Sequence, residues 1–232
     1  MLNILRAGDR GHTDHGWLDA YHTFSFADYY NAEYMGFRKL KAINEEWIQP
    51  LQGFPSHSHK DMEIIFYVID GLLEHKDSMG NSGVLYPGEI QRITAGSGIT
   101  HSEHNASERQ PVHFFHIWVF PQSQNITPSY QQMSYQDRLV SGELCLLASP
   151  DGREDSLVIH QDVSLYACRS YKVQNIEYQI AEQRHLWVQI IRGEITLNGQ
   201  RLDAGDGAAL SAEPMLSVTA NANSEFLLID QC

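Results

Sequence analysis

Short apolar runs bounded by turn-forming residues dominate the pattern of the chain. Four of them, rich in β-branched and aromatic residues, lie at residues 62–71, 112–120, 185–193 and 224–230. Such runs predict buried β-strands. Long stretches with helical periodicity are absent, and residues 129–143 have room for a helical turn or two at most. The pattern therefore predicts an all-β protein.

An internal repeat is visible once the glycines are aligned. Residues 67–93 and residues 189–210 share one order of features: strand, Gly, strand, tight turn, strand, a Gly followed by an acidic residue, and strand. Gly71 in the first copy corresponds to Gly193 in the second. Because a repeated unit of this kind signals a duplicated architecture, each copy is predicted to form one small β-barrel.

The predicted boundary between the two barrels lies between residues 131 and 150, where Ser, Gln, Gly and Pro collect. We therefore expect an N-terminal domain over residues 1–136 and a C-terminal domain over residues 137–232. The expected architecture is two jelly-roll type β-barrels packed face to face.

The formal net charge of −13 narrows the range of partners. An acidic chain without a Lys/Arg run is a poor match for a phosphate backbone, so direct nucleic-acid binding is not expected. The N-terminus has no apolar core of secretory-signal length, and the longest apolar run, Ile64 to Ile69, is too short to span a membrane. Three cysteines without a C-x-x-C pattern predict reduced thiols. These features predict a cytoplasmic protein with no membrane association.

Two pairs of metal-ligating side chains occur at strand spacing. His57 and His59 are one residue apart, and so are His101 and Glu103. Residues at i and i+2 lie on one face of a strand, so two such pairs on facing strands can converge on one ion. Either pair alone is a weak signal in a chain with twelve histidines. Together they predict a site of three imidazoles and one carboxylate.

That ligand set suits one divalent transition metal ion. Iron, manganese, nickel, copper and zinc accept such ligands, whereas calcium and magnesium require more oxygen ligands. Four protein ligands leave a position open on a five- or six-coordinate ion, which favours a catalytic role over a structural one.

The order of motifs around these pairs resembles the two sequence motifs of the cupin barrels. H-x-H is followed by an apolar strand, a Gly, a Gly-acid turn and then G-x-x-H-x-x-x-N, which begins at Gly98. The chain is further identified as a member of the pirin family by "HSHKDMEIIFYVIDG", "AGSGITHSEHN", "IWVFP" and "LLASPDG", which are spread over most of its length. The resemblance implies a short bacterial pirin-like bicupin.

One departure from the usual cupin pattern fits the pirin branch. Cupins that use a glutamate of the first motif as a ligand carry it one residue beyond Glu63, where this chain has Ile64. The resemblance implies that the metal ligands are instead His57, His59, His101 and Glu103, with iron as the expected ion. Glu63 is then expected on the strand or behind the ligands.

Two further features leave alternatives open. His116 lies on a strand that faces the expected pocket, and it either supports the ligands or packs in the interior. The aromatic segment at residues 21–30 either lines a pocket or packs over the barrel mouth.

The second copy has lost the ligand pattern. Ungapped counting from its glycines places Gln179, Ala181 and Val218 at the positions of His57, His59 and His101. The C-terminal barrel is therefore expected to bind no metal.

The resemblance to pirins implies quercetin 2,3-dioxygenase activity, which cleaves a flavonol with O2 and releases carbon monoxide. Glu103 is expected to act as general base for the flavonol 3-hydroxyl as well as ligand. Pirins also act as metal-dependent binding partners of transcription regulators and metabolic enzymes. A redox-sensing regulatory protein with a protein partner is therefore the alternative, and a cupin with a different small substrate is a third possibility.

Overall fold

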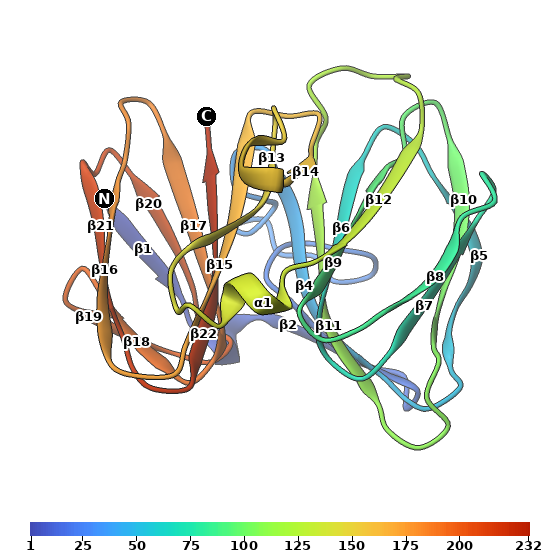
Figure 1. Ribbon diagram of the computed structural model, residues 1–232, viewed down its shortest axis with the longest axis horizontal. Coiled ribbons are helices and arrows are strands. Elements are labelled where there is room, and N and C mark those ends of the chain that lie inside the picture. Colours follow the sequence, from blue (N-terminus) through green and yellow to red (C-terminus); the bar gives the residue numbers. More distant parts are fainter. The chain divides into compact units, whose positions relative to one another are not determined.

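The computed structural model describes residues 1–232, and nearly all regular structure in it is β-strand (Figure 1). The chain forms two compact units. The N-terminal unit comprises residues 11–134 and 159–161, and the C-terminal unit comprises residues 1–10, 135–158 and 162–232.

The N-terminal unit consists of two sheets. Its strands are β2 (Gly11–Asp14), β3 (Leu18–His22), β4 (Leu40–Ile48), β5 (Gly53–His59), β6 (Glu63–Asp70), β7 (Leu73–Asp77), β8 (Ser82–Leu85), β9 (Glu89–Thr94), β10 (Ile99–Asn105), β11 (Val112–Val119) and β12 (Ser129–Ser134). The larger sheet has the order β12-β9-β6-β11-β4-β3-β2, and the smaller sheet has the order β5-β10-β7-β8.

The C-terminal unit repeats this plan. Its strands are β1 (Leu2–Leu5), β13 (Cys145–Ser149), β14 (Leu157–Val158), β15 (Val163–Ser170), β16 (Gln174–Gln179), β17 (His185–Arg192), β18 (Glu194–Leu197), β19 (Gln200–Asp203), β20 (Gly207–Ser211), β21 (Met215–Ala220) and β22 (Ser224–Gln231). Its helices are α1 (Gln136–Leu139) and the short 3-10 helices η1 (Ala7–Asp9) and η2 (Arg153–Asp155). The sheet orders are β1-β20-β17-β22-β15-β13-β14 and β16-β21-β18-β19.

The strand orders confirm the internal repeat. In the larger sheets, β9-β6-β11-β4 of the N-terminal unit corresponds to β20-β17-β22-β15 of the C-terminal unit. In the smaller sheets, β5-β10-β7-β8 corresponds to β16-β21-β18-β19. Gly71 and Gly193, which end the first strand of each copy, both have positive φ, 83° and 69°. Glycine adopts this conformation at no steric cost, which explains why both copies carry it there.

Two expectations need correction, and one is confirmed. Each unit is a jelly-roll-like pair of sheets, not a closed barrel, because no hydrogen-bonded ladder joins its smaller sheet to its larger one. The expectation of a helical turn or two at most within residues 129–143 is confirmed, since residues 129–134 form strand β12 against β9 and only the short α1 follows. The predicted division at residue 136 assigned residues 1–10 to the first domain, whereas β1 pairs with β20 in the C-terminal unit.

Strand β10 shows how the fold prepares the site. Its burial alternates along the strand, so that Ile99, His101, Glu103 and Asn105 point inward and the residues between them do not. The inward face of a strand normally carries apolar residues. Two metal-ligating side chains on such a face therefore indicate a function, because burying polar groups opposes folding unless they find partners.

No helix in the structure has both the length and the apolar character needed to cross a membrane.

Candidate metal centre

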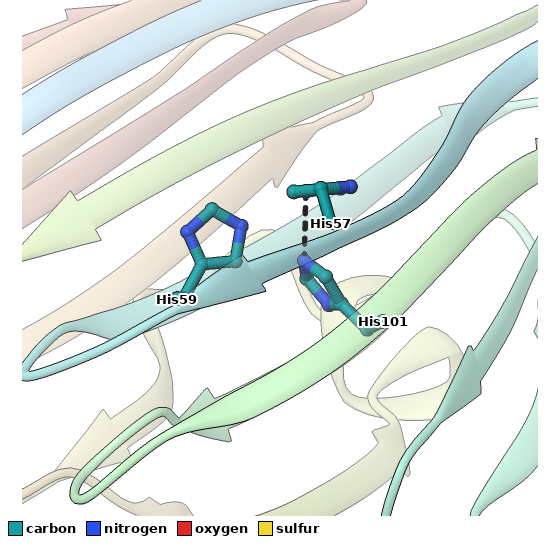
Figure 2. Close-up of side chains that lie close together, drawn as sticks. All are labelled: His57, His59 and His101. Carbon is teal, nitrogen blue, oxygen red and sulfur yellow. Dashed lines mark hydrogen bonds between the residues drawn. The ribbon is translucent and has the colours of Figure 1, made fainter.

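Strands β5 and β10 bring His57, His59, His101 and Glu103 together, and we call these four residues the ligand cluster. Figure 2 shows the three imidazole rings close together on the two strands. Their ring centroids lie 4.6–4.7 Å apart. The Nε2 atoms of His57 and His101 are 3.1 Å apart. The Glu103 carboxylate lies 3.0 Å from His101 Nε2 and 3.9 Å from His57 Nε2.

A β-bulge aims His57 at its neighbours. His57 lies opposite His101 across the β5–β10 ladder, but Glu103 lies opposite Phe54, so β5 carries one residue more than β10 over this span. Pro55 falls within the bulge, where a residue without an N–H is tolerated. Bulges of this kind redirect side chains next to functional sites.

Hydrogen bonding fixes the orientation of the His57 ring. Its Nδ1 lies 2.8 Å from the carbonyl oxygen of Pro55. A carbonyl can only accept, so Nδ1 carries a proton and donates, and Nε2 is the nitrogen left to face the cluster and bind a metal. Ligating histidines commonly have their second nitrogen held in this way.

Unpartnered polar atoms show that the cluster fits a cation. His59 Nε2 and His101 Nδ1 are buried without a hydrogen-bond partner, and only His101 Nε2, at 3.0 Å, lies beside the buried Glu103 Oε1. Buried polar atoms are rarely left unsatisfied, and each needs an explanation. Three imidazoles that converge on one carboxylate at these distances have the composition of a transition-metal site.

Electrostatics favour the deprotonated forms that a metal requires. Burial lowers the pKa of His59 to about 3, and the charges of His101 and His57 add to that effect. Burial works to raise the pKa of Glu103, but the neighbouring His101, His116 and His57 together outweigh burial, and the pKa falls below its usual value. Metal ligands must be neutral imidazoles and ionised carboxylates, so both shifts suit the same role.

The cluster is reached from one side. The His57 side chain is 36% exposed, whereas those of His101 and Glu103 are 0% and 2% exposed. Trp118 packs edge-on against His59 with ring centroids 5.0 Å apart. A bound molecule would therefore approach past His57 and meet the ligand carboxylate deep in the site.

His75 was missed by the sequence reasoning and lies beside the cluster. It pairs with Glu103 across the β10–β7 ladder, is fully buried, and its ring centroid is 5.5 Å from that of His101. Gln91 donates to its Nδ1 at 3.2 Å, and its Nε2 faces Asp77 at 3.3 Å. The alternation of buried and exposed residues along β7, which forms a hairpin with β8, is the signal that could have placed His75 inward.

His116 supports the interior and is not available as a ligand. The indole N–H of Trp118 donates to His116 Nε2 at 2.6 Å, so the opposite nitrogen carries the proton and faces Glu46 Oε1 at 3.4 Å. His116 also stacks on Phe66. The open alternative for this residue is therefore resolved in favour of packing beside the cluster.

Glu63 lies apart from the ligand cluster. It is fully buried at the start of β6, where its Oε2 accepts from Thr94 Oγ1 at 3.1 Å and from the His160 backbone N–H at 3.3 Å. Asp61, with φ of 49°, lies in the turn that separates it from His59. Burial raises the pKa of the Glu63 carboxyl, against the opposing influence of Thr94.

The raised pKa of Glu63 predicts a pH-dependent stability difference. A carboxyl whose pKa rises on folding binds more protons in the folded state, so its contribution to stability falls as pH rises above the usual range. We expect the stability of Glu63→Gln, measured relative to the wild type, to increase as the pH is raised from about 4 to about 7. Urea unfolding at both pH values measures this. The exposed Glu33→Gln serves as control, and an equal shift in both variants would contradict the assignment.

Gly53 sets the distance between the two ligand strands. A Cβ added there would lie 2.1 Å from the Glu103 carbonyl oxygen and 2.5 Å from His104 Cα. Because both are backbone atoms, β5 must move away from β10. We expect Gly53→Ala to lower the unfolding free energy by about 1–3 kcal/mol, and to weaken metal binding.

The matched control for this prediction is Gly83→Ala on β8 of the same sheet. Its added Cβ would meet the end of the Gln132 side chain at 3.1 Å, which can move. Denaturant unfolding and metal titration of both variants measure the difference. Unchanged metal affinity in Gly53→Ala would show that the strand spacing does not matter.

Strand register also corrects the predicted correspondence with the second copy. Glu103 and Val218 each pair with a residue on the strand that follows the corresponding glycine, Gly71 or Gly193. The two partner residues lie at the same distance along the chain from that glycine. Val218 is therefore the counterpart of Glu103, not of His101, and Leu216 takes the place of His101. Both Leu216 and Val218 belong to the apolar core of the C-terminal unit.

Comparison with known proteins matches both units. The family described as Pirin matches residues 5–119, and the family described as Quercetinase C-terminal cupin domain matches residues 146–231. The protein named quercetin 2,3-dioxygenase from Escherichia coli (strain K12) is 44% identical over 230 residues, which cover 99% of this chain and 98% of that protein. A protein named putative quercetin 2,3-dioxygenase PM1685 from Pasteurella multocida is 40% identical over 99% of both chains.

Solved structures agree with this match. The crystal structure of YhhW from Escherichia coli superposes with a TM-score of 0.96 at 43% identity and covers 100% of this chain and 98% of that chain. A crystal structure of the bacterial pirin YhhW from Escherichia coli in complex with nickel(II) has a TM-score of 0.94 at 43% identity, with coverage of 100% and 99%.

Proposed function

The chain belongs to the pirin family, and we propose that it is a metal-dependent dioxygenase that cleaves flavonols such as quercetin with O2 and releases carbon monoxide. The observation that carries the proposal is the ligand cluster, with three imidazole rings and one buried carboxylate gathered on β5 and β10. It lies in a chain that matches a quercetin 2,3-dioxygenase over almost its whole length.

His57, His59, His101 and Glu103 are the residues that would hold the metal. Their unpartnered buried atoms and the placement of His57 Nε2 support this assignment. A divalent transition ion would supply the Lewis acidity that lowers the pKa of a hydroxyl and the redox chemistry that activates O2. Iron is the ion we expect, and the nickel(II) complex of the related pirin supports a site that accepts several divalent ions.

Glu103 is proposed to accept the proton of the flavonol 3-hydroxyl. Only His101 Nε2 lies within hydrogen-bond distance of its Oε1, and its lowered pKa keeps the carboxylate in the ionised form that can take up a proton. His101, 3.0 Å away, holds the ionised carboxylate in place before the proton is transferred. A base must lie within hydrogen-bond reach of the proton it removes, and a hydroxyl held by a metal in the ligand cluster would lie next to the Glu103 carboxylate.

Aromatic side chains shape the rest of the site. Phe54 lies edge-on to His57 with ring centroids 6.3 Å apart, and Trp118 lies edge-on to His59. These walls would orient a flat flavonol and keep water from the reacting carbon atoms. The C-terminal unit, with Leu216 and Val218 at the ligand positions, is proposed to bind no metal.

The test of the proposed function is analysis of the products. Protein reconstituted separately with iron, manganese, nickel, copper or zinc is mixed with quercetin in air, and gas and ring-opened product are measured. We expect carbon monoxide in amounts equal to the O2 consumed with at least one redox-active ion. Flavonol loss without carbon monoxide would show a different oxidation.

A further inference from the structure

A pocket of about 470 Å³ lies in the N-terminal unit, outside the ligand cluster. Five of its lining side chains are aromatic or thioether groups from the segment after β3 and from β11: Phe26, Tyr29, Tyr30, Met35 and Trp118. The aromatic segment at residues 21–30 therefore lines a pocket, which resolves the second alternative that the sequence left open.

Trp118 is shared between this pocket and the candidate metal centre. It lines the pocket, and its ring also packs against His59 with centroids 5.0 Å apart. Phe26, another lining residue, packs edge-on against Trp118 at 4.9 Å. One indole ring thus contacts both the pocket and a residue of the ligand cluster, so the two sites lie one side chain apart.

Lys41 is the one charged side chain that lines the pocket. Its Nζ donates to the carbonyl oxygens of Ser25 at 3.1 Å and Met35 at 3.4 Å. An ammonium group has three N–H donors, so one remains for a bound molecule. The two carbonyls hold the ammonium in place, which makes the remaining donor a fixed feature of the pocket.

We propose that this pocket binds the part of the substrate that lies remote from the reacting 3-hydroxyl. The group it takes is an aromatic ring that bears a phenolic oxygen. The ring packs against Phe26 and Trp118, and the oxygen accepts a hydrogen bond from Lys41. This inference rests on the proposed function and deepens it, because it makes flavonols with hydroxylated rings the preferred substrate class.

The chemistry of the lining favours this occupant over others. Aromatic and thioether side chains bind flat rings through their faces and edges. A purely apolar ring would offer no acceptor to the remaining Lys41 donor and would gain no hydrogen bond from it. A phenolic ring satisfies the apolar walls and the donor together.

The test compares two ligands that differ only in ring hydroxyls. Metal-loaded full-length protein is titrated calorimetrically, without O2, with quercetin and with 3-hydroxyflavone, which has no other hydroxyl. We expect Lys41→Met to weaken quercetin binding about tenfold or more, since a hydrogen bond to a charged group is lost. Binding of 3-hydroxyflavone should change less than about twofold on the same grounds.

A second variant and a control separate recognition from damage to the fold. Met35→Glu places a carboxylate beside Lys41 at a residue that is 47% exposed, and it leaves the backbone carbonyl of residue 35 in place. It should reproduce the selective loss for quercetin. Lys39→Met removes a nearby charge that does not line the pocket, and it should affect neither ligand.

Equal weakening of both ligands by Lys41→Met and Met35→Glu, or no weakening of quercetin, would overturn the inference. So would failure of the wild type to bind quercetin. Because binding is measured without O2, a wild type that binds quercetin selectively but never consumes O2 would refute the proposed dioxygenase and leave the pocket assignment standing.

Discussion

A His57→Ala, His101→Ala double variant is expected to lose most of its bound metal. The two rings lie directly opposite each other on β5 and β10, with their Nε2 atoms 3.1 Å apart. Changes in groups that merely support a ligand already lower metal affinity roughly 10–100-fold. Removal of two of the four proposed ligands should therefore lower the metal affinity much further, by roughly several orders of magnitude. Metal content after purification, measured by elemental analysis, gives the result.

The matched control is His104→Ala. His104 lies on β10 next to Glu103, but it alternates with the inward residues and is not part of the ligand cluster. Like His101→Ala, the His104→Ala substitution removes an imidazole from β10, but it should leave the metal content unchanged. Full metal occupancy in the double variant would refute the ligand assignment, and so would a second stoichiometric ion retained by the C-terminal unit.

Glu103→Gln is expected to keep most of its metal while turnover of quercetin falls by about 10²–10⁴-fold, the usual contribution of a positioned proton acceptor. The amide oxygen can still coordinate, but an amide cannot take the 3-hydroxyl proton. The Glu103 side chain is 2% exposed and faces the inner side of β10, so bulk water is a poor substitute for it.

The alternative outcome has a different signature. If Glu103 acts only as a ligand, Glu103→Gln should lower metal binding and turnover together. Glu63→Gln is the matched control, because Glu63 is equally buried but bonds Thr94 and His160 outside the cluster. Metal-loaded Glu103→Gln protein that cleaves quercetin at the wild-type rate would eliminate Glu103 as the base.

The alternating and apolar segments predicted the strands well. Residues 62–71 and 112–120 became β6 and β11, since runs rich in Ile, Val and Phe have few other ways to bury their side chains. Residues 129–143 were harder, because Gln and Ser carry no strand signal. The ladder with β9 makes residues 129–134 a strand, and that ladder is a tertiary contact. Whether each unit forms a closed barrel could not be predicted either, because the alternation of residues along a strand does not show whether two sheets join at their edges.

The candidate site was predictable to the extent that it follows strand alternation. The spacing of His57 and His59, and of His101 and Glu103, placed each pair on one face, and the structure gathers all four. His75 escaped notice because it has no ligand partner two residues away in a familiar motif. Val218 was assigned to the wrong counterpart in the second copy because ungapped counting ignores differences in loop length, which the strand register resolves.

The central claim is that the ligand cluster holds a metal ion that cleaves flavonols. Elemental analysis of natively purified protein, followed by oxygen uptake with quercetin on the same sample, tests it most directly. We predict one divalent transition metal ion per chain and oxygen uptake that depends on quercetin and disappears with the metal. Protein that is fully loaded with iron, manganese, nickel or copper and takes up no oxygen with any flavonol would contradict the account.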